Sequence, residues 1–274
     1  MFRPLVALVA LAGPALAQDA ERRASHCIAL VENVPGLEYV QKAAWTDPVG
    51  QDAVRITYVD HSVYVVQTQA GLAVATDYNG YLGPEDFVPD VATMNHAHGS
   101  HWTPNPDPRI PHVLQGWGDG EGPAAHHLDL GEMLVRNVPT DIRSGYGGVE
   151  EDGNSIFVFE VAGLCIGHLG HLHHEPNAEQ YAALGRLDIV MAPVDGGMTV
   201  DIATMQRIIS RLRSSVVLPM HWFSGYSLEQ FLEGMAGEFV IERRRESSLT
   251  MTLRDLPSRP TIVVLQPLVL SARD

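Results

Sequence analysis

Seven of the 13 histidines in this chain gather in two short segments, "MNHAHGSHW" and "CIGHLGHLHH". Imidazole is the commonest protein ligand for transition metals, and a metal site needs three or four donors that converge from rigid positions. Each segment lies at the end of an apolar run that is typical of a buried strand. A third such run, "SSVVLPM", is followed directly by His221. Because ligands gather where strands end, we predict a metal site drawn from His96, His98, His101, His171 and His221.

The other histidines have less specific surroundings. His168 precedes His171 by three residues, so on a regular strand it faces the opposite side and belongs to the core or behind the ligands. For His173 a solvated loop is the simpler interpretation. No role is assigned to four further histidines, which are typical of surface or loop positions: His26, His112, His126 and His127.

The first half of the chain predicts mainly strands. Residues 54–71 alternate and turn at Gly71, residues 72–80 follow as the hairpin partner, and "DVATM" is a short buried strand that ends at the histidines. Residues 103–125 are dense in proline and glycine and predict a long loop. Further strands are expected at "EMLVRNVPT", "SIFVFEVAG" and "LCIGHLG", with a turn at "DGNS" between the first two.

The second half alternates helices with strands. Helical periodicity marks "NAEQYAALGRL", "DIATMQRIISRLR" and "SLEQFLEGMAGE", whereas "DIVMAPV", "SSVVLPM" and "RPTIVVLQP" are typical of buried strands. This order predicts an α/β (α+β) fold in which two sheets pack together with helices outside.

The first 17 residues predict a secretory signal peptide, with a basic residue, a short apolar run and a small-x-small ending. Residues 18–50 are expected to be a polar lead-in segment, and residues 51–274 a single domain. No later run is apolar for long enough to cross a bilayer, so the mature protein should be periplasmic or secreted, without membrane insertion.

Charge narrows the choice of partner. Loss of Arg3 with the signal reduces 18 basic residues to 17 against 33 acidic ones, a formal charge of −16. Such a surface repels phosphodiester backbones, which excludes nucleic acid and leaves a small molecule as the expected partner. No heptad pattern specifies an oligomeric state.

The chain has two cysteines, Cys27 and Cys165. Export would permit them to pair, but a lone cysteine within a strand is more often a small buried hydrophobic residue. We therefore expect them to remain unpaired.

The chain resembles the metallo-β-lactamase superfamily, in particular its lactonase-like and phospholipase-like branch, over about residues 54–225. "YVDHSVYVVQT" with "LAVATDYNG" resembles the opening hairpin, and His61 and Asp77 fall at its marked positions. "NHAHGSH" resembles the His-x-His-x-Asp-His signature, "GNSIFVFEVAGLCIGHLGHLHH" the strand pair ending in Gly-Asp, and "VVLPMHW" the final Pro-x-His. The resemblance implies an αββα sandwich of two mixed sheets with outer helices.

The departures from the family pattern remove every carboxylate ligand. Ser100 stands in place of the signature aspartate, Thr140 where a third histidine is usual, and His171 in place of the bridging aspartate. A carboxylate can bridge two ions about 3.5 to 4 Å apart, whereas neutral imidazole offers one lone pair to one ion. The family scaffold has two ion positions. His96, His98 and His171 could hold an ion at one position, or His101, His171 and His221 could hold an ion at the other. We expect one ion rather than two, zinc first, with iron, copper or nickel as alternatives.

The resemblance implies an exported metal-dependent hydrolase that uses a metal-bound hydroxide against a small ester, lactone or amide. Asp77, Asp195 and Asp201 are candidates for the missing base or for partners behind the ligands, although Asp195 also suits a plain turn. Trp102 and Trp117 could wall the substrate pocket. The alternative is a non-catalytic metal-binding protein on the same fold.

Overall fold

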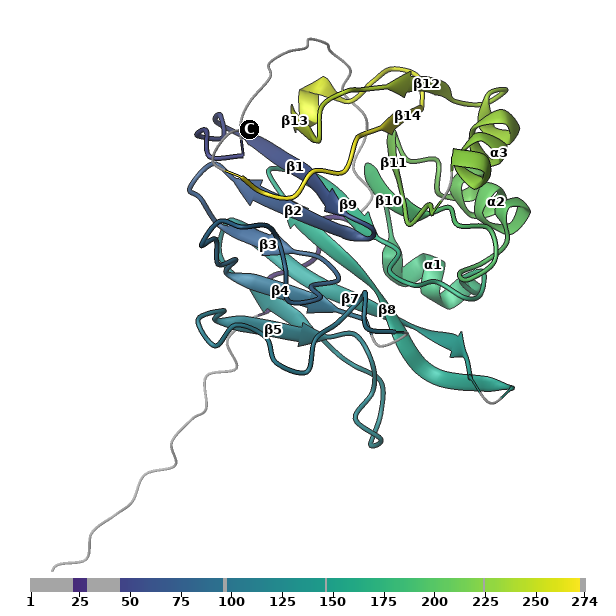
Figure 1. The fold of residues 1–274 in the computed structure, drawn as a ribbon, viewed down its shortest axis with the longest axis horizontal. Coiled ribbons are helices and arrows are strands. Elements are labelled where there is room, and N and C mark those ends of the chain that lie inside the picture. Colours follow the sequence, from purple (N-terminus) through teal and green to yellow (C-terminus); the bar gives the residue numbers. More distant parts are fainter. Residues whose placement is uncertain (1–21, 29–44, 96–97, 146, 224, 272–274) are drawn as a thin grey trace, which may run out of the picture.

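The computed structural model describes residues 22–28, 45–95, 98–145, 147–223 and 225–271. Two mixed β-sheets pack face to face, with helices against one of them (Figure 1). This architecture confirms the predicted fold class. The expected signal peptide at residues 1–17 lies outside the described residues, as does most of the expected lead-in segment.

The first sheet has six strands in the order β13-β1-β2-β3-β4-β5. The pairs β13-β1, β1-β2 and β2-β3 are antiparallel, while β3-β4 and β4-β5 are parallel. The strands are β1 (Ala53–Asp60), β2 (Val63–Thr68), β3 (Ala73–Ala75), β4 (Val91–Met94), β5 (His112–Gln115) and β13 (Ser248–Thr252).

The second sheet has eight strands in the order β12-β14-β11-β10-β9-β8-β7-β6. Its β12 to β9 half is parallel and its β9 to β6 half is antiparallel. The strands are β6 (His127–Asp129), β7 (Met133–Arg143), β8 (Val149–Val161), β9 (Leu164–His168), β10 (Ile189–Pro193), β11 (Val216–Met220), β12 (Val240–Arg243) and β14 (Thr261–Val264).

Three helices cover the outer face of the second sheet: α1 (Ala178–Leu184), α2 (Ile202–Leu212) and α3 (Gly225–Met235). Asn177 caps α1 as part of a capping box, and the Asp201 side chain accepts from the Thr204 amide to cap α2. Asp201 is thus committed to a helix end rather than to the histidines. A short 3-10 turn, Leu253–Asp255, follows β13. Within the described ranges no helix has the length and apolar character needed to span a bilayer.

Apolar side chains form three layers. The middle layer fills the space between the sheets, a second lies between the eight-stranded sheet and the helices, and a third covers the outer face of the six-stranded sheet. Trp102 and Trp117 pack edge to face, 5.8 Å apart, against this third layer. Both side chains are only partly buried there.

Several predicted boundaries are wrong. Residues 54–71 form two strands rather than one, because the chain reverses at His61 and Ser62. The expected turn at "DGNS" lies inside β8, where Asp152 has a positive φ of 53° near a register shift, and the connection from β7 to β8 runs through residues 144–148. The long loop at residues 103–125 contains β5.

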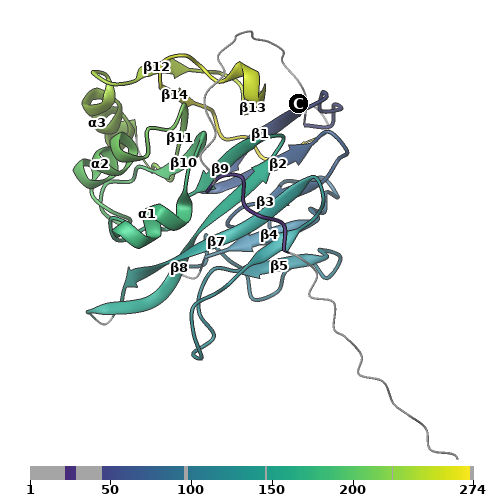
Figure 2. The ribbon, with the colours of Figure 1, turned by 180° about the vertical axis from the view of Figure 1, so that it is seen from behind.

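The expectation of unpaired cysteines is also wrong, since Cys27 and Cys165 form a disulfide. Residues 22–28 lie across the outer face of the antiparallel strands (Figure 2). There the Glu160 carboxylate accepts hydrogen bonds from the Ser25 hydroxyl and from the His26 amide, the latter at 2.9 Å. Sequence reasoning could not place Cys27 beside Cys165 because the two cysteines are 138 residues apart.

Candidate metal centre

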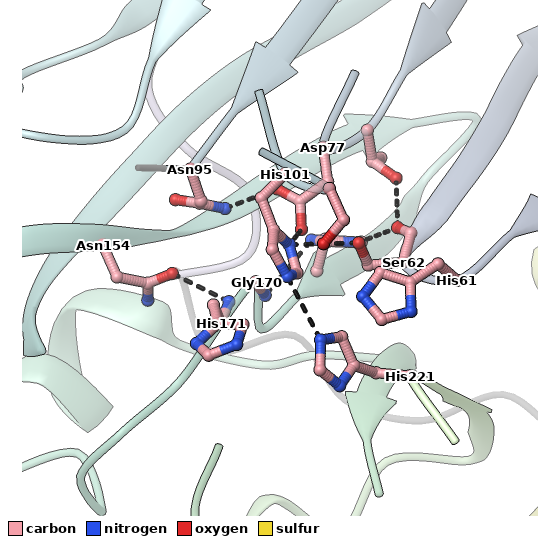
Figure 3. A network of polar contacts seen from close by, with 12 residues as sticks. His61, Ser62, Asp77, Asn95, His101, Asn154, Gly170, His171 and His221 are labelled. Carbon is pink, nitrogen blue, oxygen red and sulfur yellow. Dashed lines mark hydrogen bonds and ion pairs between the residues drawn. The ribbon is translucent and has the colours of Figure 1, made fainter. Parts of the chain in front are cut away.

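The histidine rings converge from three strand ends and one tight turn (Figure 3). His98 and His101 follow β4, His171 follows β9, and His221 follows β11 directly. The fold therefore brings together four of the five predicted ligands. The fifth, His96, lies outside the described residues.

His101 and His221 face each other through their Nε2 atoms, which are 3.1 Å apart. The Nδ1 of His101 lies 2.6 Å from Asp77 Oδ2, and the Nδ1 of His221 lies 2.9 Å from Asp195 Oδ2. An ionised carboxylate only accepts hydrogen bonds, so each Nδ1 carries a proton. In the neutral rings, both Nε2 atoms then present lone pairs to the same space.

His98 and His171 make a second facing pair, with their Nε2 atoms 3.0 Å apart. The Ser100 hydroxyl lies 2.7 Å from His98 Nδ1, and His173 Nε2 lies 2.7 Å from His171 Nδ1. The Arg143 amide donates to His173 Nδ1. His173 is therefore a contact of the cluster and not the solvated loop residue that was expected.

His61 is a cluster residue that was absent from the predicted ligand set. Its ring centroid lies 3.9 Å from that of His221 and 5.3 Å from that of His101. One ligand atom from each of His61, His98, His101 and His221 lies within 4.8 Å of the others. The signal that could have found it is the polar triplet Asp60, His61 and Ser62 between two apolar alternating runs, which marks a turn.

A polar frame behind the rings fixes the strand ends. Asn95 donates to Asp77 Oδ1 at 2.7 Å and accepts from the Ser155 amide at 2.9 Å. The Asn154 side chain accepts from the His171 amide and donates to Thr140. Thr140, predicted to stand in a ligand position, thus lies one layer behind His171. Buried His168 contacts the Ser62 carbonyl at 2.8 Å and supports the turn that carries His61.

The electrostatics favour neutral imidazoles backed by anions. Burial and the neighbouring rings lower the pKa of His61 to about 3 and that of His98 to about 4. Burial alone would raise the pKa values of Asp77 and Asp195, but the contacts with His101 and with His221 and Thr199, respectively, hold both below the usual range. Neutral rings are the form that binds a metal.

The residues therefore fit a divalent cation. Carboxylates behind two rings fix their orientation and tautomer, as is usual for histidine ligands, and the facing lone pairs need a positive charge between them. Asp77 and Asp195 both occupy this supporting position. Neither carboxylate belongs to the group of ligand atoms from His61, His98, His101 and His221 that lie within 4.8 Å of one another.

An exposed aromatic side chain lies beside the centre. Phe223 is 63% exposed, and its ring centroid lies 5.1 Å from that of His61 and 5.2 Å from that of His221. An apolar surface in contact with the cluster offers a platform for the apolar part of a bound molecule.

Comparison with known proteins agrees with this fold. A family model described as "Beta-lactamase superfamily domain" matches residues 55–221, and the chain belongs to the metallo-β-lactamase superfamily. A structure from Thermotoga maritima, also of that superfamily, is 24% identical with a TM-score of 0.56, covering 77% of this chain and 98% of its own. A metallo hydrolase from Ignicoccus hospitalis, Igni18, is 19% identical with a TM-score of 0.52, covering 73% of this chain and 98% of its own. No curated protein matches significantly.

Proposed function

We propose that this protein is a metal-dependent hydrolase of a small ester, lactone or amide, with one ion, preferably zinc, at the histidine cluster. The observation that carries the proposal is the facing pair of His101 and His221, each backed by a buried carboxylate. When bound, the ion would supply Lewis-acid activation of water and of the substrate carbonyl. Iron, copper and nickel also suit imidazole ligands and are alternatives to zinc.

The protein's own groups divide into two roles. His101 and His221 hold the ion, and Asp77 and Asp195 orient those two rings. The Arg143 amide donates to His173 Nδ1, so a neutral His173 donates to His171 Nδ1, and a neutral His171 carries its proton on Nε2. The Nε2 of His98, which faces that proton, is the further nitrogen available to accept a proton. Both carboxylates that reach the cluster are already committed to histidine rings, so the proton acceptor is an imidazole.

The surroundings support a small organic substrate. Phe223 provides an exposed apolar surface next to His61 and His221, suited to the hydrocarbon part of an ester or lactone. The strongly negative chain disfavours a nucleic acid substrate.

We further propose that the protein works in the periplasm or outside the cell. The disulfide between Cys27 and Cys165 supports this location, because such bonds form and persist in oxidising compartments. The sequence of the first 17 residues supports it independently.

The first test is elemental analysis of the purified protein, combined with turnover of an ester, lactone and amide series with and without chelator. We expect about one zinc per chain, chelator-sensitive turnover, and metal loss in His101→Ala and His221→Ala but not in His126→Ala. His126 is a matched control because its ring contacts the Gln115 carbonyl outside the cluster. Bound metal without turnover would favour the non-catalytic alternative, and equal metal content in all variants would overturn the site.

A further inference from the structure

We infer that His61 is a ligand of the ion, so that His61, His101 and His221 form a three-imidazole set. This inference rests on the proposed metal centre and adds a residue from a turn in the first sheet. Three observations carry it: the backbone conformation of His61, the state of its ring nitrogen and its place among the other rings.

The backbone of His61 is held in an unfavourable conformation. Its φ of 47° lies in the left-handed region, which is uncommon for residues other than glycine. The carbonyl of His61 accepts from the Tyr58 hydroxyl at 2.7 Å and from the His221 amide at 2.8 Å. Such strain persists only where the surroundings over-determine it, and it concentrates at functional sites. Here the amide of one proposed ligand holds the turn that carries another.

The His61 ring has a buried nitrogen without a partner. Its Nε2 is shielded from solvent and finds no hydrogen-bond partner among the described residues. Leaving such an atom unsatisfied is costly, and a metal ion would satisfy it. The other cluster rings each have a nitrogen bonded behind them, in the pairs His98–Ser100, His101–Asp77, His171–His173 and His221–Asp195.

The His61 ring lies closer to His221 and His101 than to His98, as expected if these three residues bind the same ion. His61 lies 3.9 Å from His221 and 5.3 Å from His101 between ring centroids, but 6.2 Å from His98. Three imidazoles hold an ion while leaving a coordination position open, which is the arrangement of catalytic rather than structural zinc sites. A ligand from this turn would compensate for the carboxylate ligands of the family pattern, which this chain replaces with other residues.

Simple packing is the competing role, since His61 also contacts Phe223. The decisive experiment titrates the metal-free protein with Co²⁺ and records its visible absorption, which depends on the number and type of ligands. The main variant is His61→Asn, because asparagine tolerates a left-handed backbone. His126→Asn is the matched control, and thermal melting of each metal-free protein checks the fold.

We expect His61→Asn to bind Co²⁺ about 100-fold more weakly with an altered spectrum, while His126→Asn matches the wild type. A second variant, His61→Gly, suits the left-handed backbone and leaves space for free imidazole, which should restore the wild-type spectrum. Wild-type affinity and spectrum in His61→Asn would overturn the inference while leaving the proposed function intact. Failure of the wild type to bind Co²⁺ or Zn²⁺ would overturn both.

Discussion

His101 and His221 present their Nε2 atoms to each other across 3.1 Å, although they are 120 residues apart in the sequence. The carboxylates behind them fix both Nδ1 protons, so neither ring can relieve the contact by exchanging tautomers. The fold therefore creates a site between the two Nε2 atoms that favours a positive charge.

Neutralising either supporting carboxylate should weaken metal binding. In Asp77→Asn and Asp195→Asn, the ring behind each carboxylate loses its anionic acceptor, and we expect metal affinity to fall about 10- to 100-fold. Competition with a chromophoric chelator measures this change. Asp201→Asn is the control, because Asp201 only caps α2 and asparagine caps equally well. A loss of affinity in Asp201→Asn equal to that of the other two variants would contradict the assignment.

Gly170→Ala should disturb the frame behind His171. Gly170 has a φ of 60°, and an added Cβ would lie 2.5 Å from Asn95 Nδ2 and 2.6 Å from Asn154 Oδ1. We expect the free energy of unfolding to fall by about 2 kcal/mol or more, with weaker metal binding. Urea denaturation of the metal-free protein measures the first effect. Gly50→Ala is the control, because among the described residues no atom beyond its chain neighbours lies within 4 Å of the added Cβ. It should change little, and equal losses in the two variants would refute the argument.

Breaking the disulfide should destabilise the fold without removing the metal centre. Cys27 and Cys165 close a loop with a sequence separation of 138, so the bond restricts the unfolded chain strongly. We expect the Cys27→Ala and Cys165→Ala double variant to lose about 3 to 5 kcal/mol of unfolding free energy. Denaturant curves under oxidising conditions test this, with the reduced wild type as comparison. Superimposable curves for variant and oxidised wild type would contradict it.

The metal-free protein should lose stability as the pH falls from 6.5 toward about 4. The folded pKa values of His61 and His98, about 3 and 4, lie below the ordinary value of 6.5. Between pH 6.5 and about 4, these histidines bind protons in the unfolded chain but stay neutral in the folded protein. The free energy of unfolding therefore decreases as the pH falls. Above pH 6.5 both states are neutral at these rings and the contribution disappears.

Melting temperatures between pH 7.5 and 4.5 test this sign. His98→Gln should lose less stability on acidification than the wild type, because it removes one of the cluster rings whose pKa is lowered by burial. The lowered carboxyl pKa values of Asp77 and Asp195 contribute stability that is lost only as the pH falls below about their ordinary value of 3.8, outside this range. If the melting temperatures of His98→Gln and the wild type fell by the same amount over this pH range, the result would contradict a buried, neutral histidine cluster.

The sequence alone indicated the fold class and most of the residues that the fold brings together in the candidate site. Apolar runs identified the buried strands that precede His98 and His221, and helical periodicity identified α1, α2 and α3. These are local properties, because period and burial follow directly from the order of side chains. The convergence of His98, His101, His171 and His221 was predictable because ligands gather where strands end.

Only the tertiary structure decided how His61, Asp77, Asp195 and the cysteines act. The turn at His61 depends on contacts from Tyr58 and His221, and the latter lies 160 residues further along the chain. The roles of Asp77 and Asp195 depend on which ring each carboxylate meets, and the disulfide depends on where residues 22–28 cross the second sheet. Sequence order fixes local periodicity, but it does not specify distances between residues brought together by packing.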